Sequence, residues 1–404
     1  MTKEGQQTPE ASQLRGSNQG GMRAYNERAV LTLLRQSGPL AKSEIARATG
    51  LTAQTVSVIM RALEAEGLLQ RCDPVRGRIG QPMVPMRLAE RGAFFLGLKV
   101  GRRSLEIILT DFLGRVLAAR RQDCRFPSPD EVLAFASDAA ASLTGALEPA
   151  EQSRLAGLGV AMPFYFWDWT GAPEQPGSTL SWQGRDIAAE LSARLQIPVY
   201  AENDGSAACN AELVFGGPEV PRDFLYVFIG YFAGGGLAVE GQLFTGRSGN
   251  AGAVGSLPVG ERNGRPVQLI EVASLAALER MLADSGRPGA ALWASPDAWD
   301  VPPALLDTWV GQAAQGLSRA IAAASCMIDF QTVVIDGWLP AGLRHGLTER
   351  TRTHLNNNRL PGVALPELRE GTAGSGARSL GAASLPLSRR FLVDRTAFLK
   401  GATP

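Results

Sequence analysis

The chain of 404 residues contains little cysteine and almost no histidine. Its four cysteines are far apart and form no CxxC pair: Cys72, Cys124, Cys209 and Cys326. The two histidines, His345 and His354, add no common zinc-ligand spacing. Nothing in this distribution suggests a disulfide framework or a common zinc site, and we expect a protein without a metal site or a bound cofactor.

Long apolar runs are also missing. No apolar stretch approaches the roughly 20 residues that a helix needs to cross a bilayer, and the polar N-terminus lacks the apolar segment of a signal peptide. Hydrophobic residues nevertheless make up 45% of the chain and charged residues 20%, which is typical of a globular protein with a full core. We therefore expect a cytoplasmic protein of two or three domains with no membrane partner.

The formal net charge of +1 conceals an uneven distribution. Residues 22–87 contain ten Lys and Arg but five Asp and Glu, a net charge of +5, whereas residues 1–21 sum to zero. The remainder of the chain is therefore acidic by four charges. A basic segment of this kind favours nucleic acid as the partner.

Residues 43–69 predict a helix-turn-helix. A short helix over residues 43–49 is followed by Gly50 and Leu51, and Thr52 can cap a second helix. The second helix has one apolar face at helical spacing: Val56, Ile59, Met60 and Leu63. Such a turn favours a DNA-binding element whose second helix enters the major groove, and the alternative is a plain pair of packed helices.

The surroundings of this element predict a winged helix. Residues 24–36 read as a preceding helix, Gly67 suits a left-handed helix end, and residues 68–72 can pair with residues 83–88 around a basic loop. Short polar side chains and arginine suit base edges and phosphates. The residues expected to contact DNA are Thr52, Gln54, Thr55, Ser57 and Arg61 on the helix, and Arg76 and Arg78 in the wing.

The rest of the chain alternates strands and helices. Residues 94–117 predict two strands and a turn, and the pattern recurs at residues 224–244. Such a duplicated hairpin fits the two ribonuclease H-like lobes of the actin–hexokinase–Hsp70 superfold. Helices are expected at residues 130–147, 187–195, 202–213, 267–282, 302–324, 343–355 and 379–387, and strands at residues 155–162, 198–201 and 332–335, with a Gly-rich loop at residues 370–378.

Both parts resemble one family. The first part has S-E-I-A-R-A-T-G-L-T-A-Q-T-V-S, then E-G-L-L and a wing that ends in G-Q-P; this resembles the N-terminal module of ROK-family regulators. Ala41 stands where that family has a Ser or Thr cap, which should cost about 1 kcal/mol. Gln81, another expected DNA contact, replaces the usual Arg of the wing. The second part resembles the ROK sugar-kinase fold over most of residues 95–383, most specifically at E-N-D, residues 202–204.

The resemblance implies a nucleotide site that is no longer intact. ROK kinases read D-x-G-x-T at the first hairpin turn, G-T-G-x-G-G-G at the second and Gly-Gly after the last strand. Here these positions read Lys99-Val100-Gly101-Arg102-Arg103, Gly230-Tyr231-Phe232-Ala233-Gly234-Gly235-Gly236 and Asp336-Gly337-Trp338. A carboxylate for Mg²⁺ is lost, and two aromatic residues replace a phosphate-binding turn. We expect a protein that is not an enzyme.

The sugar side implied by the resemblance is partly retained. Asn203, Asp204 and Glu271 match sugar-binding positions, whereas Ala253 and Ser256 replace the Glu and His of G-E-x-G-H. The cysteine-rich run that completes the zinc site of many relatives is also absent. The alternatives to ligand contact are structural: Asn203 and Asp204 could cap a helix, and Glu271 could occupy a position that the helix dipole favours.

These observations predict a DNA-binding transcriptional regulator, a sugar-responsive repressor, with a non-catalytic ROK domain. The alternatives are a sugar kinase with a DNA-binding arm, and a regulator controlled by a protein partner. Expected partners are double-stranded operator DNA, a sugar or sugar derivative, and a second copy in a homodimer or higher oligomer. Expected boundaries are a disordered lead-in at 1–21, the winged helix at 22–90, the ROK domain at 91–388 and a tail at 389–404.

Overall fold

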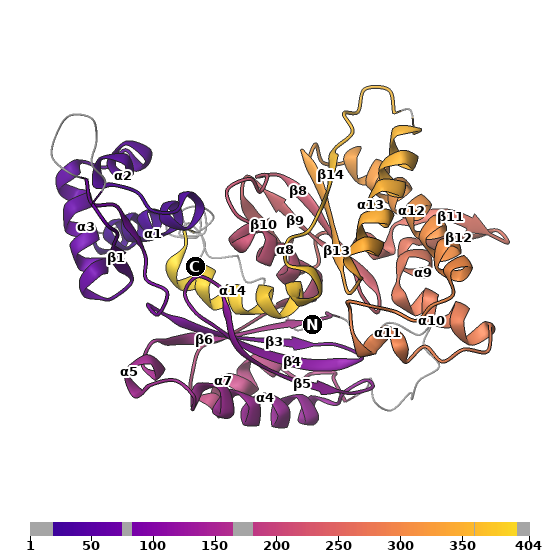
Figure 1. Cartoon of the computed structure of the whole chain (residues 1–404), viewed down its shortest axis with the longest axis horizontal. Helices are drawn as coiled ribbons and strands as arrows, with labels where there is room; N and C mark the ends of the chain where they lie inside the picture. The colour runs from indigo at the N-terminus through magenta and orange to yellow at the C-terminus, as the bar shows by residue number, and fades with distance from the viewer. Residues whose placement is uncertain (1–18, 75–82, 165–180, 359, 394–404) are drawn as a thin grey trace, which may run out of the picture. The chain divides into compact units, whose positions relative to one another are not determined.

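The computed structural model describes residues 19–74, 83–164, 181–358 and 360–393. The chain forms two compact units. The first comprises residues 1–88 together with residues 388–404, and the second comprises residues 89–387. Figure 1 shows the elements of both units.

The first unit is a winged helix. Three helices, α1 (Gln19–Ser37), α2 (Lys42–Thr49) and α3 (Ala53–Ala65), precede an antiparallel pair of strands, β1 (Leu69–Arg71) and β2 (Met86–Leu88). Leu40 adds a single bridge to Met86. Residues from all three helices form the core: Val30, Leu34, Ile45, Val56, Ile59 and Leu63. The predicted helices are confirmed. The first begins at Gln19, so the last three residues of the expected lead-in are helical, and residues 1–18 lie outside the described residues.

Local capping fixes the ends of the second and third helices. The Thr52 hydroxyl accepts a hydrogen bond from the Thr55 amide at 3.1 Å, as an N-cap should. Beyond α3, Gly67 has a φ of 74° and Leu68 N donates to the Leu63 carbonyl, which is a Schellman ending. Ala41 has no cap group, but the Glu44 carboxylate accepts from Ala41 N at 2.7 Å. Glu44 therefore supplies half of a capping box.

The second unit contains two five-stranded sheets with one topology. The first sheet has the order β5-β4-β3-β6-β7 and the second β10-β9-β8-β13-β14; in each, the first two pairings are antiparallel and the last two parallel. The first comprises β3 (Phe94–Val100), β4 (Ser104–Thr110), β5 (Val116–Asp123), β6 (Leu155–Met162) and β7 (Val199–Asn203). The second comprises β8 (Phe224–Ile229), β9 (Ala233–Val239), β10 (Gln242–Phe244), β13 (Thr332–Gly337) and β14 (Glu367–Glu370). This repetition confirms the predicted two-lobed fold.

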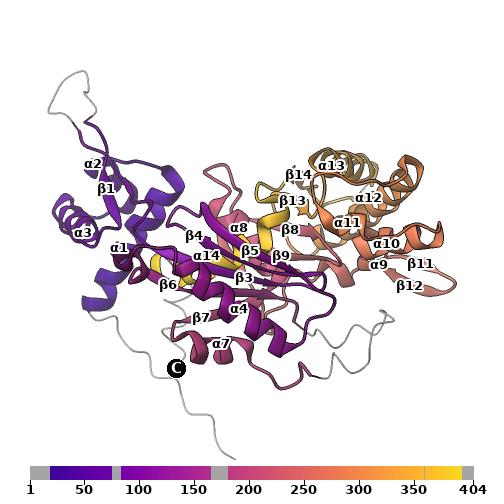
Figure 2. The same ribbon diagram turned by 60° about the horizontal axis from the view of Figure 1, so that its bottom comes forward.

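Helices cover both faces of each sheet. The first sheet packs its outer face on α4 (Pro129–Thr144) and α7 (Ile187–Leu195), as Figure 2 shows. The second packs on α9 (Leu269–Ala273), α10 (Leu275–Asp284), α12 (Pro303–Ser325) and α13 (Ala341–Asn356). Between the sheets lie α8 (Asp204–Phe215) and α14 (Ala377–Phe391), which meet at Ala207 and Ala382. A side chain at Gly159 would overlap the Ala382 carbonyl, so this glycine permits α14 to lie close to β6. Two short helices, α5 (Pro149–Gln152) and α11 (Ala291–Ala294), complete the set.

Several predicted boundaries were wrong. The helix expected at residues 202–213 begins at Asp204, because Glu202 and Asn203 end a strand. The helix expected at residues 267–282 is broken at Ser274, whose hydroxyl accepts from Ala233 N at 2.8 Å. The closing helix continues to Phe391, into the expected tail, and Val393 N donates to the Thr32 hydroxyl of α1. The strand β14 and the hairpin of β11 (Pro258–Arg262) and β12 (Arg265–Gln268) were not predicted.

No helix in the described part of the chain is both long and apolar enough to pass through a membrane.

Candidate functional site

The recognition helix α3 presents most of its predicted DNA-contacting residues to solvent. Thr52, Gln54 and Arg61 are exposed, and Thr55 and Ser57 are half-buried. The Thr55 hydroxyl lies 2.8 Å from that of Thr52, so these two groups are occupied in capping. Arg61 Nε donates to the Ser57 carbonyl, which holds the arginine along the helix. Polar side chains, one of them an arginine, thus make up most of this face.

One further residue on this face was not predicted. Val58 is 47% exposed, four residues after Gln54 and three before Arg61, so it lies on the same side of α3. An exposed aliphatic group on a recognition helix suits the methyl group of thymine. The helical periodicity of the sequence could have revealed it.

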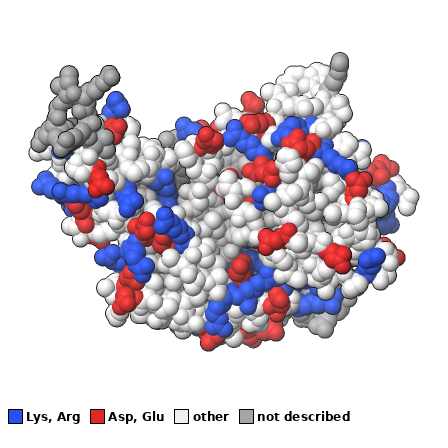
Figure 3. Space-filling view, in the orientation of Figure 1, with Lys and Arg blue, Asp and Glu red and all other residues white. Residues whose placement is uncertain are grey.

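An arginine in the strands of the wing is paired with a carboxylate, so the strands carry less net positive charge than their number of arginines suggests. Arg71 on β1 makes a bidentate pair with Glu64 of α3, at 2.7 and 3.1 Å, so its charge is balanced locally. Arg76, Arg78 and Gln81 lie outside the described residues. Among the described residues on the face shown in Figure 3, basic and acidic side chains are interspersed.

The second unit has a cavity of about 500 Å³ between its lobes. Asn203 and Asp204 line it, at the junction of β7 and α8. Glu271 does not; its carboxylate accepts from Gln268 N at 2.8 Å and caps α9, and Gln268 and Ile270 line the cavity instead. Further polar or charged residues line the cavity and were not predicted as ligand contacts, among them Asn250, Ser256, Arg102 and Arg378. Contact of Asn203, Asp204 or Glu271 with a ligand stays a prediction.

The side chains of Asn203 and Asp204 make different contacts. The Asn203 side-chain oxygen accepts from Gly205 N at 2.9 Å and Ser206 N at 3.3 Å, so it caps α8. The Asp204 carboxylate instead accepts from Arg378 Nη1 at 3.3 Å, an ion pair of two largely buried side chains. Asp204 is therefore held by a cation that comes from the first turn of α14.

The first hairpin turn is unsuited to a metal–phosphate complex. Lys99 is 4% exposed, and its ammonium group donates to the Ser104 hydroxyl at 2.7 Å. Burial, assisted by the charge of Arg378, lowers the pKa of Lys99 to about 7. A buried amine at this position offers no ligand to Mg²⁺, which prefers oxygen donors.

The second hairpin turn packs directly on the first. The Arg102 guanidinium lies 4.4 Å from the centre of the Phe232 ring, and the Arg103 guanidinium lies 4.9 Å from that of Tyr231. Arg103 also donates to Glu279 at 2.6 Å. Burial lowers the pKa of Arg102 to about 10, which leaves it charged at neutral pH. The two turns that would hold nucleotide phosphates in a kinase are joined here by cation–π contacts.

Tryptophans fill the space beside these turns. Trp338 is 8% exposed and donates to the Leu292 carbonyl at 2.8 Å, and Arg121 stacks on it at 4.7 Å. Trp293 lies 5.6 Å from the Tyr231 ring. The cavity that remains there measures about 20 Å³, which has room for a single water and not for a nucleotide.

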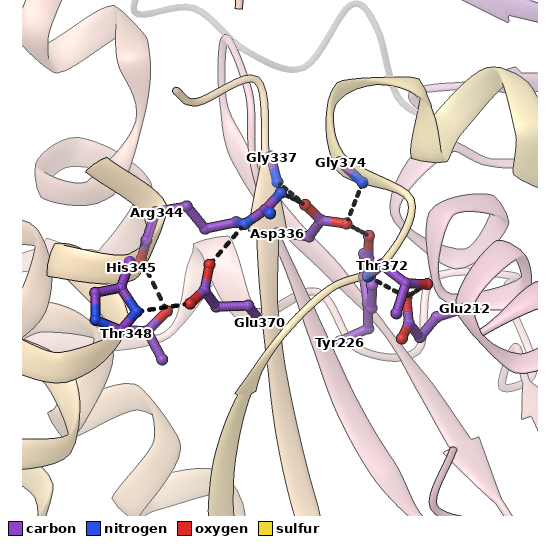
Figure 4. Close-up of polar contacts among 10 residues, drawn as sticks. All are labelled: Glu212, Tyr226, Asp336, Gly337, Arg344, His345, Thr348, Glu370, Thr372 and Gly374. Carbon is purple, nitrogen blue, oxygen red and sulfur yellow. Dashed lines mark hydrogen bonds and ion pairs between the residues drawn. The ribbon is translucent and has the colours of Figure 1, made fainter. Parts of the chain in front are cut away.

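A buried polar cluster replaces the glycine pair at the end of β13 (Figure 4). The Asp336 carboxylate accepts from the Tyr226 hydroxyl, from Gly337 N and from Gly374 N, each at 2.9 Å. Arg344 donates to it at 3.0 Å. Burial raises the pKa of Asp336 in spite of these donors. These hydrogen bonds satisfy the buried carboxylate and fix the end of β13.

Comparisons with known proteins agree with this geometry. The profile of the ROK family matches residues 95–388, and a profile described as winged helix-turn-helix DNA-binding matches residues 23–70. The uncharacterized protein y4fQ of Sinorhizobium fredii is 28% identical, over 94% of this chain and 96% of its own length. The xylose repressor of Bacillus spizizenii is 22% identical, over 60% of this chain and 62% of the repressor.

One solved structure has the same two-part organisation. It is that of a ROK family transcriptional regulator, a homolog of the E. coli MLC protein; it superposes with a TM-score of 0.69 at 21% identity, covering 94% of this chain and 99% of that one. This likeness establishes the fold. With the family profile matching most of the sequence, the chain belongs to the ROK family and has an N-terminal winged helix-turn-helix.

Proposed function

We propose that the protein is a DNA-binding transcriptional repressor whose ROK domain binds a small sugar-like effector without phosphorylating it. One observation carries the proposal: a winged helix with an exposed polar recognition face is joined to a kinase fold whose phosphate-binding turns are packed on each other. The regulators and repressors among the similar proteins support the first half. The 500 Å³ cavity supports the second, because it has the size of a small-molecule site.

Genome-wide mapping of the bound DNA tests the regulator. We expect sites upstream of genes for uptake or breakdown of one compound, each with two half-sites one helical turn apart, because we propose a homodimer. At a mapped site, Arg61→Ala should cost roughly 1–3 kcal/mol of preference over random DNA if Arg61 reads a base. Arg265→Ala, on the exposed β12, is the matched control. Binding without site preference and without salt sensitivity would contradict the proposal.

A kinase remains the competing function, because Asp204 stands where ROK kinases have their general base. Turnover of ATP against a panel of sugars distinguishes the two. We expect no sugar-dependent turnover by the wild type or by Asp204→Asn. Phosphorylation by the wild type that disappears in Asp204→Asn would establish the enzyme instead.

Control by a protein partner is the second alternative. A ligand at a hundred times its Kd stabilises a protein by about 2.7 kcal/mol, which a thermal-shift assay detects. We expect at least one sugar or sugar derivative to give this shift and to change operator affinity. A full panel without any shift would favour the partner.

A further inference from the structure

The side of α3 that points away from the core is a narrow stripe along the helix. Four apolar side chains define the core side, and none is more than 8% exposed: Val56, Ile59, Met60 and Leu63. With 3.6 residues per turn, the opposite side carries residues at spacings of four, three and four. These residues are all exposed: Gln54, Val58, Arg61 and Ala65. A surface that binds this helix therefore meets this stripe first.

Val58 is the apolar member of the stripe that has a sizeable side chain. It is 47% exposed, whereas the other large apolar side chains of α3 are buried. A β-branched residue is also a poorer helix former than alanine, because the helix restricts its χ1 rotamers. Folding therefore gains little from a valine at this position, and its use is to be sought in what α3 binds.

The neighbouring side chains leave the middle of the stripe to Val58. The hydroxyl groups of Thr52 and Thr55 are bonded to each other at the start of the helix. Arg61 Nε donates to the Ser57 carbonyl at 3.2 Å, which directs the start of its guanidinium along the helix. Residues four apart on one helix face are about 6 Å apart, which spans about two base steps of 3.4 Å. Val58 is thus placed to meet a base edge beside the one that faces Gln54.

The chemistry of the major groove determines which base suits an isopropyl group. Most positions on the base edges there are hydrogen-bond donors or acceptors, and a valine would bury them without a partner. Thymine differs because it presents a 5-methyl group, which an aliphatic side chain can cover. A valine in this place therefore favours thymine and disfavours the other bases.

We propose that Val58 is a specificity-determining residue, which reads the 5-methyl group of one thymine in each operator half-site. The proposal rests on the proposed function, because it requires α3 to lie in the major groove of operator DNA. It has a consequence for modified DNA. 5-Methylcytosine carries a methyl group at the same ring position, so methylation of a cytosine at this place should strengthen binding.

The test uses the full-length protein and an operator found by mapping, with affinities measured by fluorescence anisotropy at one salt concentration. Each thymine of a half-site is replaced in turn by uracil, which removes only the methyl group. At one thymine the loss should be about fourfold per half-site, the value of one buried methyl group. A duplex with cytosine there should bind more weakly, and 5-methylcytosine should recover about fourfold.

Val58→Ala should abolish this discrimination. We expect it to weaken binding to the thymine operator about fourfold per half-site and to leave binding to the uracil operator almost unchanged, so that the two changes are coupled. Val116→Ala is the matched control, because Val116 is 53% exposed on β5 in the other unit of the chain. It should keep the full preference for thymine over uracil.

Several results would overturn the proposal. One is specific binding that is indifferent to every thymine methyl group, and another is a methyl effect that is equally large in Val58→Ala. A third is 5-methylcytosine that binds no better than cytosine. In urea denaturation, a larger loss of stability in Val58→Ala than in Val116→Ala would show that Val58 is a packing residue instead. Absence of any site-specific binding would overturn the proposed function as well.

Discussion

The two ends of the cleft in the ROK domain differ in what fills them. One end is an open cavity of about 500 Å³ lined by amides, hydroxyls and two arginines. The other keeps about 20 Å³, because Tyr231, Trp293 and Trp338 occupy the space beside the hairpin turns. The ligand-sized cavity and the turns that match phosphate-binding positions thus lie in different parts of one fold. The packing at the second end joins the two lobes through the contacts of Arg102 and Arg103 with aromatic rings.

Removing a buried tryptophan from the filled end should give the largest change in the free energy of unfolding. Trp338→Ala removes a buried indole, its hydrogen bond to Leu292 and the platform for Arg121, and should lower the free energy of unfolding by about 3–5 kcal/mol. Urea denaturation measures it. Phe244→Ala, at a side chain 50% exposed in the same domain, should cost far less. Equal losses would show that Trp338 is no more important than a surface residue.

Replacing the buried Lys99 should raise the free energy of unfolding, by an amount that depends on pH. The pKa of Lys99 is about 7 in the folded chain against 10.5 ordinarily, so the unfolded chain binds more protons between these values. Wild-type stability from this group therefore rises with pH through that window. Lys99→Met should be more stable than the wild type at pH 7, on the order of 1–3 kcal/mol after loss of the Ser104 contact.

The difference in stability between Lys99→Met and the wild type should shrink as the pH approaches 10.5. Thermal melts across this pH range would measure it. Arg265→Met, an exposed cation with no such burial, should give a difference that is flat with pH. An advantage of Lys99→Met that grew with pH would contradict the burial of a strained ammonium group.

The bracing between the hairpin turns should be weaker but measurable. In a double-mutant cycle of Arg102→Met and Phe232→Leu, the coupling free energy should be about 0.5–2 kcal/mol, the range of a cation–π contact. Denaturation of the four proteins gives the value. A coupling of zero would mean that the two side chains only share space.

The smallest effect is expected at the open end. Asn250→Ala removes one amide from the cavity wall and should weaken an effector by about 0.5–1.5 kcal/mol, with stability unchanged. Calorimetry with the effector measures it, and Gln242→Ala, outside the cavity, is the control. A large loss of stability in Asn250→Ala would show that the open end is also structural.

The sequence predicted what local chemistry decides. Thr52 and Gly67 mark the ends of the recognition helix because capping and a positive φ depend on neighbouring residues alone. The hairpin of β11 and β12 could also have been predicted, because its turn is Asn263-Gly264 and Asn-Gly is the strongest short-range signal for a hairpin. Asn203 and Asp204, which the family motif singled out, line the cavity, and their contact with a ligand stays a prediction.

Contacts between distant segments could not be predicted in the same way. The sequence showed that Lys99 and Tyr231 depart from the kinase motifs, but not that Arg103 stacks on an aromatic ring 128 residues away. Arg378 fell in an expected Gly-rich loop, and only the crossing of α8 and α14 brings it to Asp204. The break at Ser274 depends likewise on a strand elsewhere in the chain. Each of these depends on how segments that are distant in the sequence pack together.

Helix α14 runs across the boundary between the two units of the chain. Its first turn carries Arg378, which lines the cavity, and its last residues, from Ser388 on, belong to the winged-helix unit. Pro386, which has no N–H to donate, lies just before the boundary at Leu387 and weakens the helix there. The helix that supplies Arg378 to the cavity wall is therefore continuous in sequence with residues of the winged-helix unit.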